Sequence, residues 1–199
     1  LKSRLIGDFN AENLLAALAV LLGWEVPLDR AVRALEASSA PPGRMEVLPS
    51  TGPIVVIDYA HTPDALAKAI KATRQHTTGR LICIFGCGGD RDAGKRPLMG
   101  AIAEELADVV VLTDDNPRGE DPEQIIAAIR SGMRFPDRVR VERQRVQAIA
   151  AALDLAGPTD AVLIAGKGHE TGQVIGDETL PFNDRDVALQ AMQVRGFSP

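Results

Sequence analysis

The stretch LICIFGCGGDRDAGKRPLMGAIAEELADVVVLTDDNPR, residues 81–118, decides the fold. It begins with a continuous apolar run at residues 81–85, passes through a glycine-rich turn, and continues in a helical pattern over residues 96–107. A second apolar run follows at residues 109–113. Strands that are apolar at every position are covered on both faces, and a helix between two such strands predicts that they are parallel.

The same alternation extends in both directions from this stretch. Further strands are expected at residues 54–59, 139–142 and 161–165, and further helices at residues 63–75, 122–133, 144–156 and 184–194. Residues 173–182 indicate an edge hairpin that turns at Gly176-Asp177. The pattern predicts an α/β, Rossmann-like fold, in which helices flank a mostly parallel sheet.

Two helices are also expected near the start of the chain, at residues 10–22 and 26–35, where apolar residues recur at helical spacing. Breakers and small residues then gather at residues 38–43, as they do in linkers. We therefore expect two parts. Residues 1–41 form the helical end of a preceding domain, and residues 42–199 form the α/β domain.

The composition is that of a globular protein, with 45% hydrophobic residues and a formal net charge of −5. Interspersed charges without a basic stripe argue against a nucleic-acid partner, and no apolar run is long enough for a membrane helix. We expect a cytoplasmic protein.

Cys83 and Cys87 lack the further ligands of a zinc site, so no metal site is expected. The start at Leu1, without methionine, suggests a longer parent protein.

Polar residues follow four of the expected strands. Because ligands bind beyond the carboxyl ends of parallel strands, these four loops should line one rim of the sheet. The loops are Asp58-Tyr-Ala-His-Thr-Pro63, Gly86-Cys-Gly-Gly-Asp-Arg-Asp92, Asp114-Asp-Asn-Pro-Arg118 and Gly166-Lys-Gly-His-Glu170.

Residues 89–96 almost fit the phosphate loop G-x-x-x-x-G-K-[ST]. Arg96 stands where the magnesium-binding hydroxyl belongs, and Asp90 and Asp92 would face the phosphates, so we reject a nucleotide loop here. Two interpretations stay open with equal weight. The segment is a glycine-rich turn between strand and helix, or Arg91 in it binds an anion.

The third loop has a plain explanation as a turn, and a binding role is equally compatible with its residues. Chemical complementarity favours binding, because Arg118 offers a fork to a carboxylate, Asn116 adds neutral hydrogen bonds, and Glu170 can accept from an ammonium group. Together they indicate a pocket for an amino-acid zwitterion. His61 and His169 have no accompanying nucleophile, so a hydrogen-bonding role is favoured over acid–base catalysis.

The four loops, in this order, resemble the C-terminal domain of the Mur ligases that add diaminopimelate, the UDP-N-acetylmuramoyl-tripeptide synthetases. The resemblance covers the whole chain. Phe9-Asn-Ala-Glu-Asn13 is similar to an adenine-side motif of the central ATPase domain, and Gly43-Arg-Met-Glu46 to the hinge into the last domain. Asp115-Asn-Pro-Arg118 is similar to the family's signature for meso-diaminopimelate rather than lysine.

The resemblance implies roles for individual residues. For meso-diaminopimelate it implies Arg91, Asp115, Asn116, Pro117, Arg118, Gly166 and Glu170. For ATP it implies Asn10, Asn13, Arg44 and Asp58, with His61, Lys167 and His169 as further candidates. It also implies that ATP, with Mg²⁺, activates a UDP-N-acetylmuramoyl dipeptide as an acyl phosphate that the amino acid attacks.

The sequence also departs from the family pattern. The phosphate loop, the magnesium ligands and the UDP-binding domain have no counterpart, so the chain alone is expected to be inactive. Thr171-Gly172 replaces an acidic–aromatic pair that often follows the last loop. A lysine-adding or folylpolyglutamate-type ligase and a non-catalytic amino-acid-binding module stay open as alternatives, although Arg118 favours a substrate with a second carboxylate.

Overall fold

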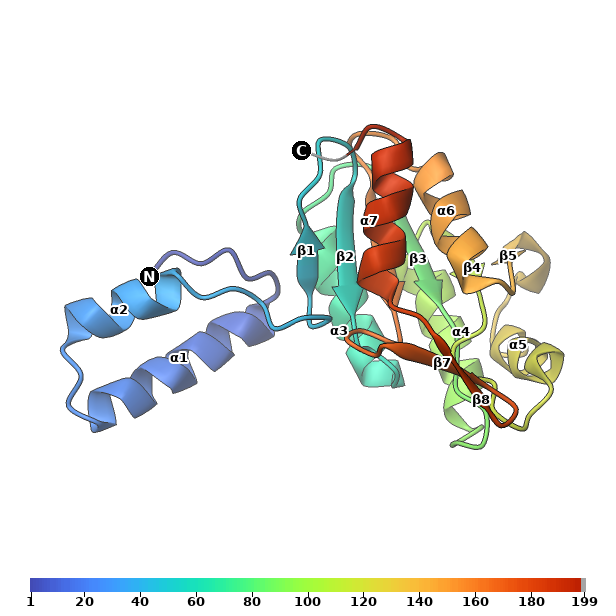
Figure 1. Cartoon of the computed structure of the whole chain (residues 1–199), viewed down its shortest axis with the longest axis horizontal. Coiled ribbons are helices and arrows are strands. Elements are labelled where there is room, and N and C mark those ends of the chain that lie inside the picture. The colour runs from blue at the N-terminus through green and yellow to red at the C-terminus, as the bar shows by residue number, and fades with distance from the viewer. Residues whose placement is uncertain (198–199) are drawn as a thin grey trace.

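A six-stranded sheet with the order β1-β2-β6-β3-β4-β5 forms the centre of the computed structural model, which describes residues 1–197 (Figure 1). Strand β1 pairs antiparallel to β2, and the other neighbours are parallel. The strands are β1 (Glu46–Leu48), β2 (Ile54–Asp58), β3 (Leu81–Phe85), β4 (Val109–Leu112), β5 (Arg140–Val141) and β6 (Ala161–Ala165).

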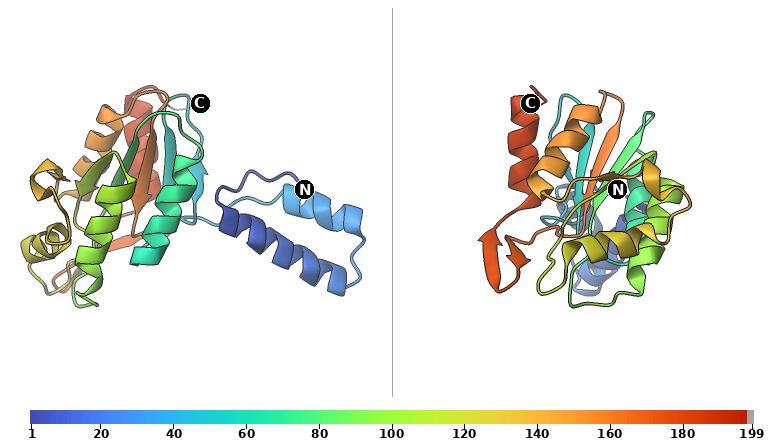
Figure 2. Two further views of the ribbon diagram at one scale, coloured as in Figure 1. Left: turned by 180° about the vertical axis from the view of Figure 1, so that it is seen from behind. Right: turned by 90° about the vertical axis from the view of Figure 1, so that its right-hand side faces the viewer.

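Helices cover both faces of this sheet, because alternate residues of its buried strands point to opposite sides. Val56, Cys83 and Leu163 pack on one side against α3 (Pro63–Arg74), α4 (Lys95–Leu106) and α5 (Pro122–Arg130). Residues one position along the strands pack on the other side against α6 (Arg145–Leu155) and α7 (Asp184–Val194). Figure 2 shows the two helical layers from behind and from the side. The predicted Rossmann-like architecture is confirmed.

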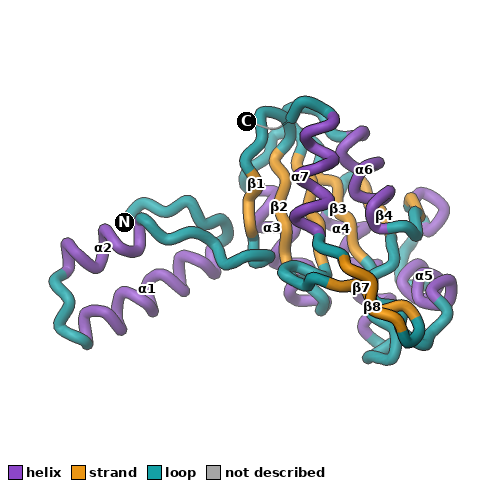
Figure 3. Tube along the Cα trace, viewed as in Figure 1, coloured by secondary structure: helices purple, strands orange, loops and turns teal. Residues whose placement is uncertain are grey.

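The hairpin of β7 (Gly172–Ile175) and β8 (Glu178–Pro181) forms a sheet of its own. Its turn at residues 176–177 is as predicted, but its place at an edge of the main sheet is not. It lies instead beyond the carboxyl ends of the parallel strands, where the loops gather (Figure 3). One isolated bridge, between Arg118 and Ile175, ties it to the loop after β4.

Strand β1 was not expected from the sequence. It has three residues, of which only Leu48 is buried, so it carries no apolar periodicity to recognise. A short 3₁₀ helix, Pro136–Arg138, precedes β5. The other predicted strands and helices are present, with ends that shift by up to a few residues.

Helices α1 (Asp8–Gly23) and α2 (Leu28–Glu36) pack against each other and project to one side of the α/β unit (Figure 1). Helix α1 is apolar around most of its circumference and exposes 66% of Leu15, and Trp24 just beyond it is 74% exposed. Phe9 at its base and Ile6 just before it connect this part of the chain to the core. Within residues 1–197 no helix is long and apolar enough to cross a membrane.

Candidate functional site

The four predicted loops lie together at the carboxyl edge of the sheet. They surround a cavity of about 490 Å³, which we call the rim cavity. Six of the seven residues predicted to bind the amino acid line it: Arg91, Asp115, Asn116, Arg118, Gly166 and Glu170. Pro117 is not among the lining residues, and its carbonyl accepts a hydrogen bond from the Glu120 N–H at 3.1 Å, which closes the turn.

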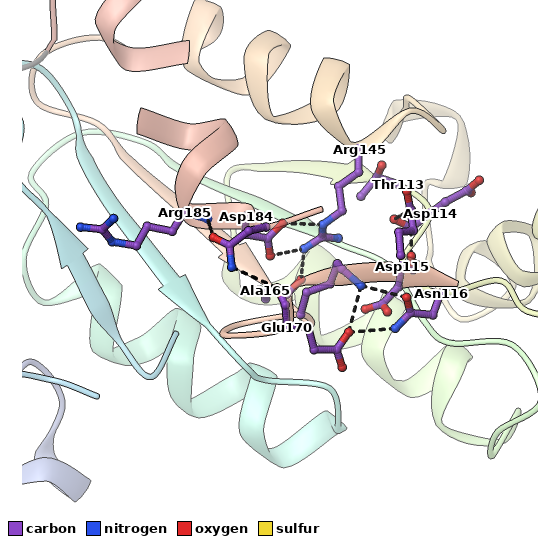
Figure 4. A network of polar contacts seen from close by, with 12 residues as sticks. Thr113, Asp114, Asp115, Asn116, Arg145, Ala165, Glu170, Asp184 and Arg185 are labelled. Atoms are coloured by element: carbon purple, nitrogen blue, oxygen red, sulfur yellow. Dashed lines mark hydrogen bonds and ion pairs between the residues drawn. The ribbon is translucent and has the colours of Figure 1, made fainter. Parts of the chain in front are cut away.

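Lys167 fixes Asn116 and Glu170 in one triangle of hydrogen bonds. Its buried Nζ donates to Asn116 Oδ1 and to Glu170 Oε2, each at 2.9 Å. Asn116 Nδ2 also donates to Glu170 Oε2, at 2.9 Å (Figure 4). Burial works to raise the pKa of Glu170, but these two donors together lower it. Glu170 is therefore held as a carboxylate. Both hydrogen bonds use Oε2, so within residues 1–197 Oε1 stays available to accept from a ligand.

Asp115 supplies a second carboxylate, and it is 7% exposed. Burial raises its pKa, although the charges of Arg145 and Lys167 act in the opposite direction. Gly166 allows the close approach, since it has a φ of +115° and a Cβ there would lie 2.7 Å from Asp115 Oδ2. Among residues 1–197 no side chain donates a hydrogen bond to the Asp115 carboxylate, so its lone pairs are available to a ligand.

Arg118 is one of the cationic residues that line the rim cavity, and its backbone is in the left-handed conformation, with φ of +52°. Its Nη1 donates to the Gly89 carbonyl at 2.9 Å, and a Cβ at Gly88 would lie 2.8 Å from that nitrogen. The glycines of the second loop therefore make room for this guanidinium. Arg91 is exposed at the cavity mouth, as one of the two interpretations of that loop requires.

Arg96, by contrast, is 4% exposed and pairs with Glu120 at 2.7 Å. It ties α4 to the loop before α5, which agrees with the rejection of a nucleotide loop.

The hairpin supports the Asp115–Arg118 loop from the side. The N–H of Val174 donates to Asn116 Oδ1 at 2.9 Å, and the N–H of Arg118 donates to the Val174 carbonyl at 3.1 Å. Gln173 Nε2 donates to the Asp115 carbonyl at 2.8 Å. The binding residues of this loop are therefore positioned by a segment 58 or 59 residues further along the chain.

A second cavity, of about 350 Å³, lies between α1, α3 and the segment before β1, and we call it the hinge cavity. All four residues predicted to contact ATP line it: Asn10, Asn13, Arg44 and Asp58. Asp58 Oδ2 accepts from the Met45 N–H at 2.8 Å, and burial raises the pKa of Asp58 despite this bond.

Tyr59 separates the two cavities. Arg44 of the hinge cavity lies over its ring, 4.5 Å from the centroid, while Tyr59 itself lines the rim cavity. His61 also lines the rim cavity, and its Nδ1 is 2.8 Å from the Tyr59 carbonyl. His169 is not among the lining residues and packs 5.4 Å from the Tyr59 ring. His61 thus has the hydrogen-bonding contact expected for it, whereas the His169 side chain makes a ring contact, so the hydrogen-bonding role of His169 stays a prediction.

Sequence reasoning missed the pair of Arg145 and Asp184, which lies behind the rim cavity (Figure 4). Both side chains are fully buried, and Arg145 Nε donates to Asp184 Oδ1 at 2.7 Å. A signal was available. Arg145 lies on the apolar face of α6 with Ala148, Ile149 and Ala152, so its charge was bound to be buried.

Cys83 and Cys87 are buried thiols, and burial raises the pKa of each to about 12. Residues 1–197 contain no group of three or more His, Cys, Asp or Glu side chains arranged to hold a metal ion.

The parallel sheet with a charged cavity at its carboxyl edge defines a Rossmann-like domain suited to a small polar ligand. Residues 43–168 match the family model described as "Mur ligase, glutamate ligase domain". The chain belongs to the Mur ligase family.

Individual relatives narrow the comparison. The chain is 53% identical over 189 residues to a UDP-N-acetylmuramoyl-L-alanyl-D-glutamate–2,6-diaminopimelate ligase of Coxiella burnetii. This match covers 94% of the chain and 39% of the relative. A solved structure of a ligase of the same name is 42% identical, with a TM-score of 0.78, over 98% of this chain and 40% of that one.

A folylpolyglutamate synthase of Mycobacterium tuberculosis, solved with ADP and AMPPCP, is 29% identical with a TM-score of 0.67. This match covers 82% of the chain and 38% of the synthase. The chain thus spans about 40% of the length of the relatives it matches.

Proposed function

We propose that this chain is the C-terminal part of an ATP-dependent ligase that adds meso-2,6-diaminopimelate to UDP-N-acetylmuramoyl-L-alanyl-D-glutamate in peptidoglycan synthesis. The observation that carries the proposal is the convergence of six predicted binding residues on the rim cavity. Relatives named for this reaction, at 53% and 42% identity, support it. A cytoplasmic location belongs to the same proposal.

The charges of the rim cavity match the distal end of meso-diaminopimelate. Its carboxylate fits the guanidinium of Arg118, with Asn116 and Arg91 near enough to share its remaining lone pairs. Its ammonium group fits between Asp115 and the free oxygen of Glu170. Lysine lacks the distal carboxylate and would leave Arg118 without its anion, which favours diaminopimelate.

In the proposed reaction ATP phosphorylates the substrate carboxylate, the amine attacks the resulting acyl phosphate, and an amide, ADP and phosphate are formed. The hinge cavity supplies part of the nucleotide site through Asn10, Asn13, Arg44 and Asp58. We assign Mg²⁺ and the phosphate-binding loop to the part of the parent protein outside this chain, and residues 1–41 to the end of that ATPase domain. The chain alone is therefore not expected to turn over.

Arg118→Ala in the intact ligase tests the choice of amino acid. We expect the KM for meso-diaminopimelate to rise by a factor of tens or more, because the variant loses a bidentate, charge-assisted contact worth about 2–5 kcal/mol. Arg118→Lys should restore only part of the affinity, since an ammonium group cannot reproduce the fork. Steady-state kinetics with each substrate varied in turn measure both effects.

The KM values for ATP and for the UDP-linked substrate should stay within a few fold and serve as the internal control. A lower melting temperature with an unchanged preference for diaminopimelate would mean that Arg118 only closes a turn. The wild-type ligase could also prefer lysine or glutamate to diaminopimelate. That result would contradict the proposal and indicate a lysine-adding or folylpolyglutamate-type activity.

A further inference from the structure

Arg145 and Asp184 stand at the first positions of α6 and α7, the two helices that cover one face of the sheet. Their side chains are completely buried and share two hydrogen bonds, of 2.7 and 2.8 Å. A buried ion pair is a poor source of stability, since an apolar pair of similar volume commonly serves the fold equally well. The position of this pair, directly behind the rim cavity, points to a role in the site instead.

One link to the site runs through the backbone. Arg145 Nη2 donates to the carbonyl of Ala165 at 3.0 Å, the last residue of β6. The next residue, Gly166, lines the rim cavity and packs against the carboxylate of Asp115. Arg145 therefore fixes the point from which the Gly166–Glu170 loop starts.

A second link runs through charge. Arg145 Nη1 is buried and has no hydrogen-bond partner in residues 1–197. In Figure 4 this free end of the guanidinium is directed toward Asp115. The positive charge of Arg145 is the largest influence that opposes the effect of burial on the Asp115 carboxylate. An orphaned donor beside a buried carboxylate that lacks donors of its own indicates electrostatic support of Asp115.

We propose that Arg145 is a positioning residue of the amino-acid site, which acts through Asp115 and the Ala165 carbonyl and keeps the anionic wall that receives the ammonium group of the substrate. The inference rests on the proposed function, because it assumes that this cavity binds the amino acid. Asp184 holds the guanidinium of Arg145 in place by accepting two hydrogen bonds from it.

The test removes the charge of Arg145 without leaving a buried charge unpaired. Arg145→Met alone should destabilise the intact ligase, since Asp184 then lacks its partner. The double variant Arg145→Met with Asp184→Leu should recover most of the melting temperature. If Arg145 positions the site, the KM for meso-diaminopimelate in the double variant stays raised by about tenfold or more, while the KM for ATP stays within about twofold.

The pH dependence separates positioning from folding. In the double variant the loss of Arg145 should raise the pKa of Asp115 further, and the loss of Asp184 should offset only part of this rise, because Asp184 has the smaller influence. Lys167 and Glu170 are the other charged groups that act on Asp115. Asp115 must be ionised to bind an ammonium group, so the ratio of double-variant to wild-type KM should fall as the pH rises. A control variant, Arg80→Met, breaks a pair with Asp160 at the other end of the strands and should change stability without changing this ratio.

Three outcomes are distinct. A KM that returns to the wild-type value together with stability in the double variant, or a ratio that does not change with pH, would overturn the role of Arg145. A wild-type ligase that does not accept meso-diaminopimelate would overturn the proposed function, and this inference with it. A raised, pH-sensitive KM in a stably folded double variant supports both.

Discussion

Asp115 shows how one residue can be unfavourable for the fold and useful for the site. Its carboxylate is buried, no side chain in residues 1–197 donates to it, and burial raises its pKa. Keeping a charge in such a place costs stability, and groups of this kind cluster at functional sites. The same lack of partners leaves the carboxylate free for a cationic ligand.

Asp115→Asn should therefore stabilise the protein while weakening amino-acid binding. We expect a gain of about 1 kcal/mol, or about 2–4 °C in Tm, together with a KM for meso-diaminopimelate at least about tenfold higher. Because the folded-state pKa is raised, the gain should be complete above that pKa and should vanish as the pH falls toward the ordinary carboxyl value. Thermal melts across pH 4–8 and steady-state kinetics measure the two effects, and a variant that loses stability at neutral pH would contradict this account.

The residues of the rim cavity could be predicted because strand ends are visible in the sequence and a parallel sheet brings its carboxyl ends together. The Arg145–Asp184 pair was a harder case. Each residue alone shows a charge on an apolar helix face, but the two are 39 residues apart, and a local pattern does not reveal that they meet. The Asn116–Lys167 contact spans 51 residues and was missed for the same reason.

At the scale of elements, the β7–β8 hairpin supports the binding loop although it belongs to another sheet. Its turn residues predicted the hairpin. Its place could not be predicted, because a two-stranded ribbon whose side chains are half-buried or exposed has no buried apolar face to show where it packs. The contacts that place it use backbone groups and the side chain of Gln173. Contacts of this kind produce no periodic pattern in the sequence, so the sequence does not show which residues they join.

Gln173→Ala should loosen the binding loop by removing the donor to the Asp115 carbonyl. We expect a loss of about 1 kcal/mol in stability and a severalfold higher KM for meso-diaminopimelate, with the KM for ATP unchanged. The matched control is Glu178→Gln on the exposed strand β8 of the same hairpin, which removes a charge and leaves the Gln173 contact in place. Equal effects of the two substitutions on KM would show that the hairpin as a whole, rather than Gln173, sets the position of the loop.

At the scale of the whole molecule, the α1–α2 pair and the α/β unit are joined by residues 37–45, which contain little regular structure. We propose the division at residues 1–41 and 42–199, of which the last two residues lie outside the described part. Helix α1 was predicted from its composition. The direction in which the pair projects was not, because few side chains, chiefly those of Ile6 and Phe9, bind its base to the core.

Limited proteolysis should therefore cut first at residues 38–43 and leave an intact fragment from about residue 42 onward. Gly43 packs closely on Gly168, so cleavage should concentrate before it, at the exposed positions of the linker. Mass spectrometry of the first products identifies the site. Primary cuts within residues 54–165 would contradict the division.

Tyr59 lines the rim cavity, and the guanidinium of Arg44, which lines the hinge cavity, lies over its ring. A ligand that fixes this ring from either side changes what a ligand on the other side meets. Thermodynamic linkage requires such coupling to be mutual. If a ligand in the hinge cavity changes the affinity of the rim cavity by some factor, a ligand in the rim cavity changes the affinity of the hinge cavity by the same factor. Affinities measured for one ligand alone would then describe a different equilibrium from the one that holds when both ligands are present.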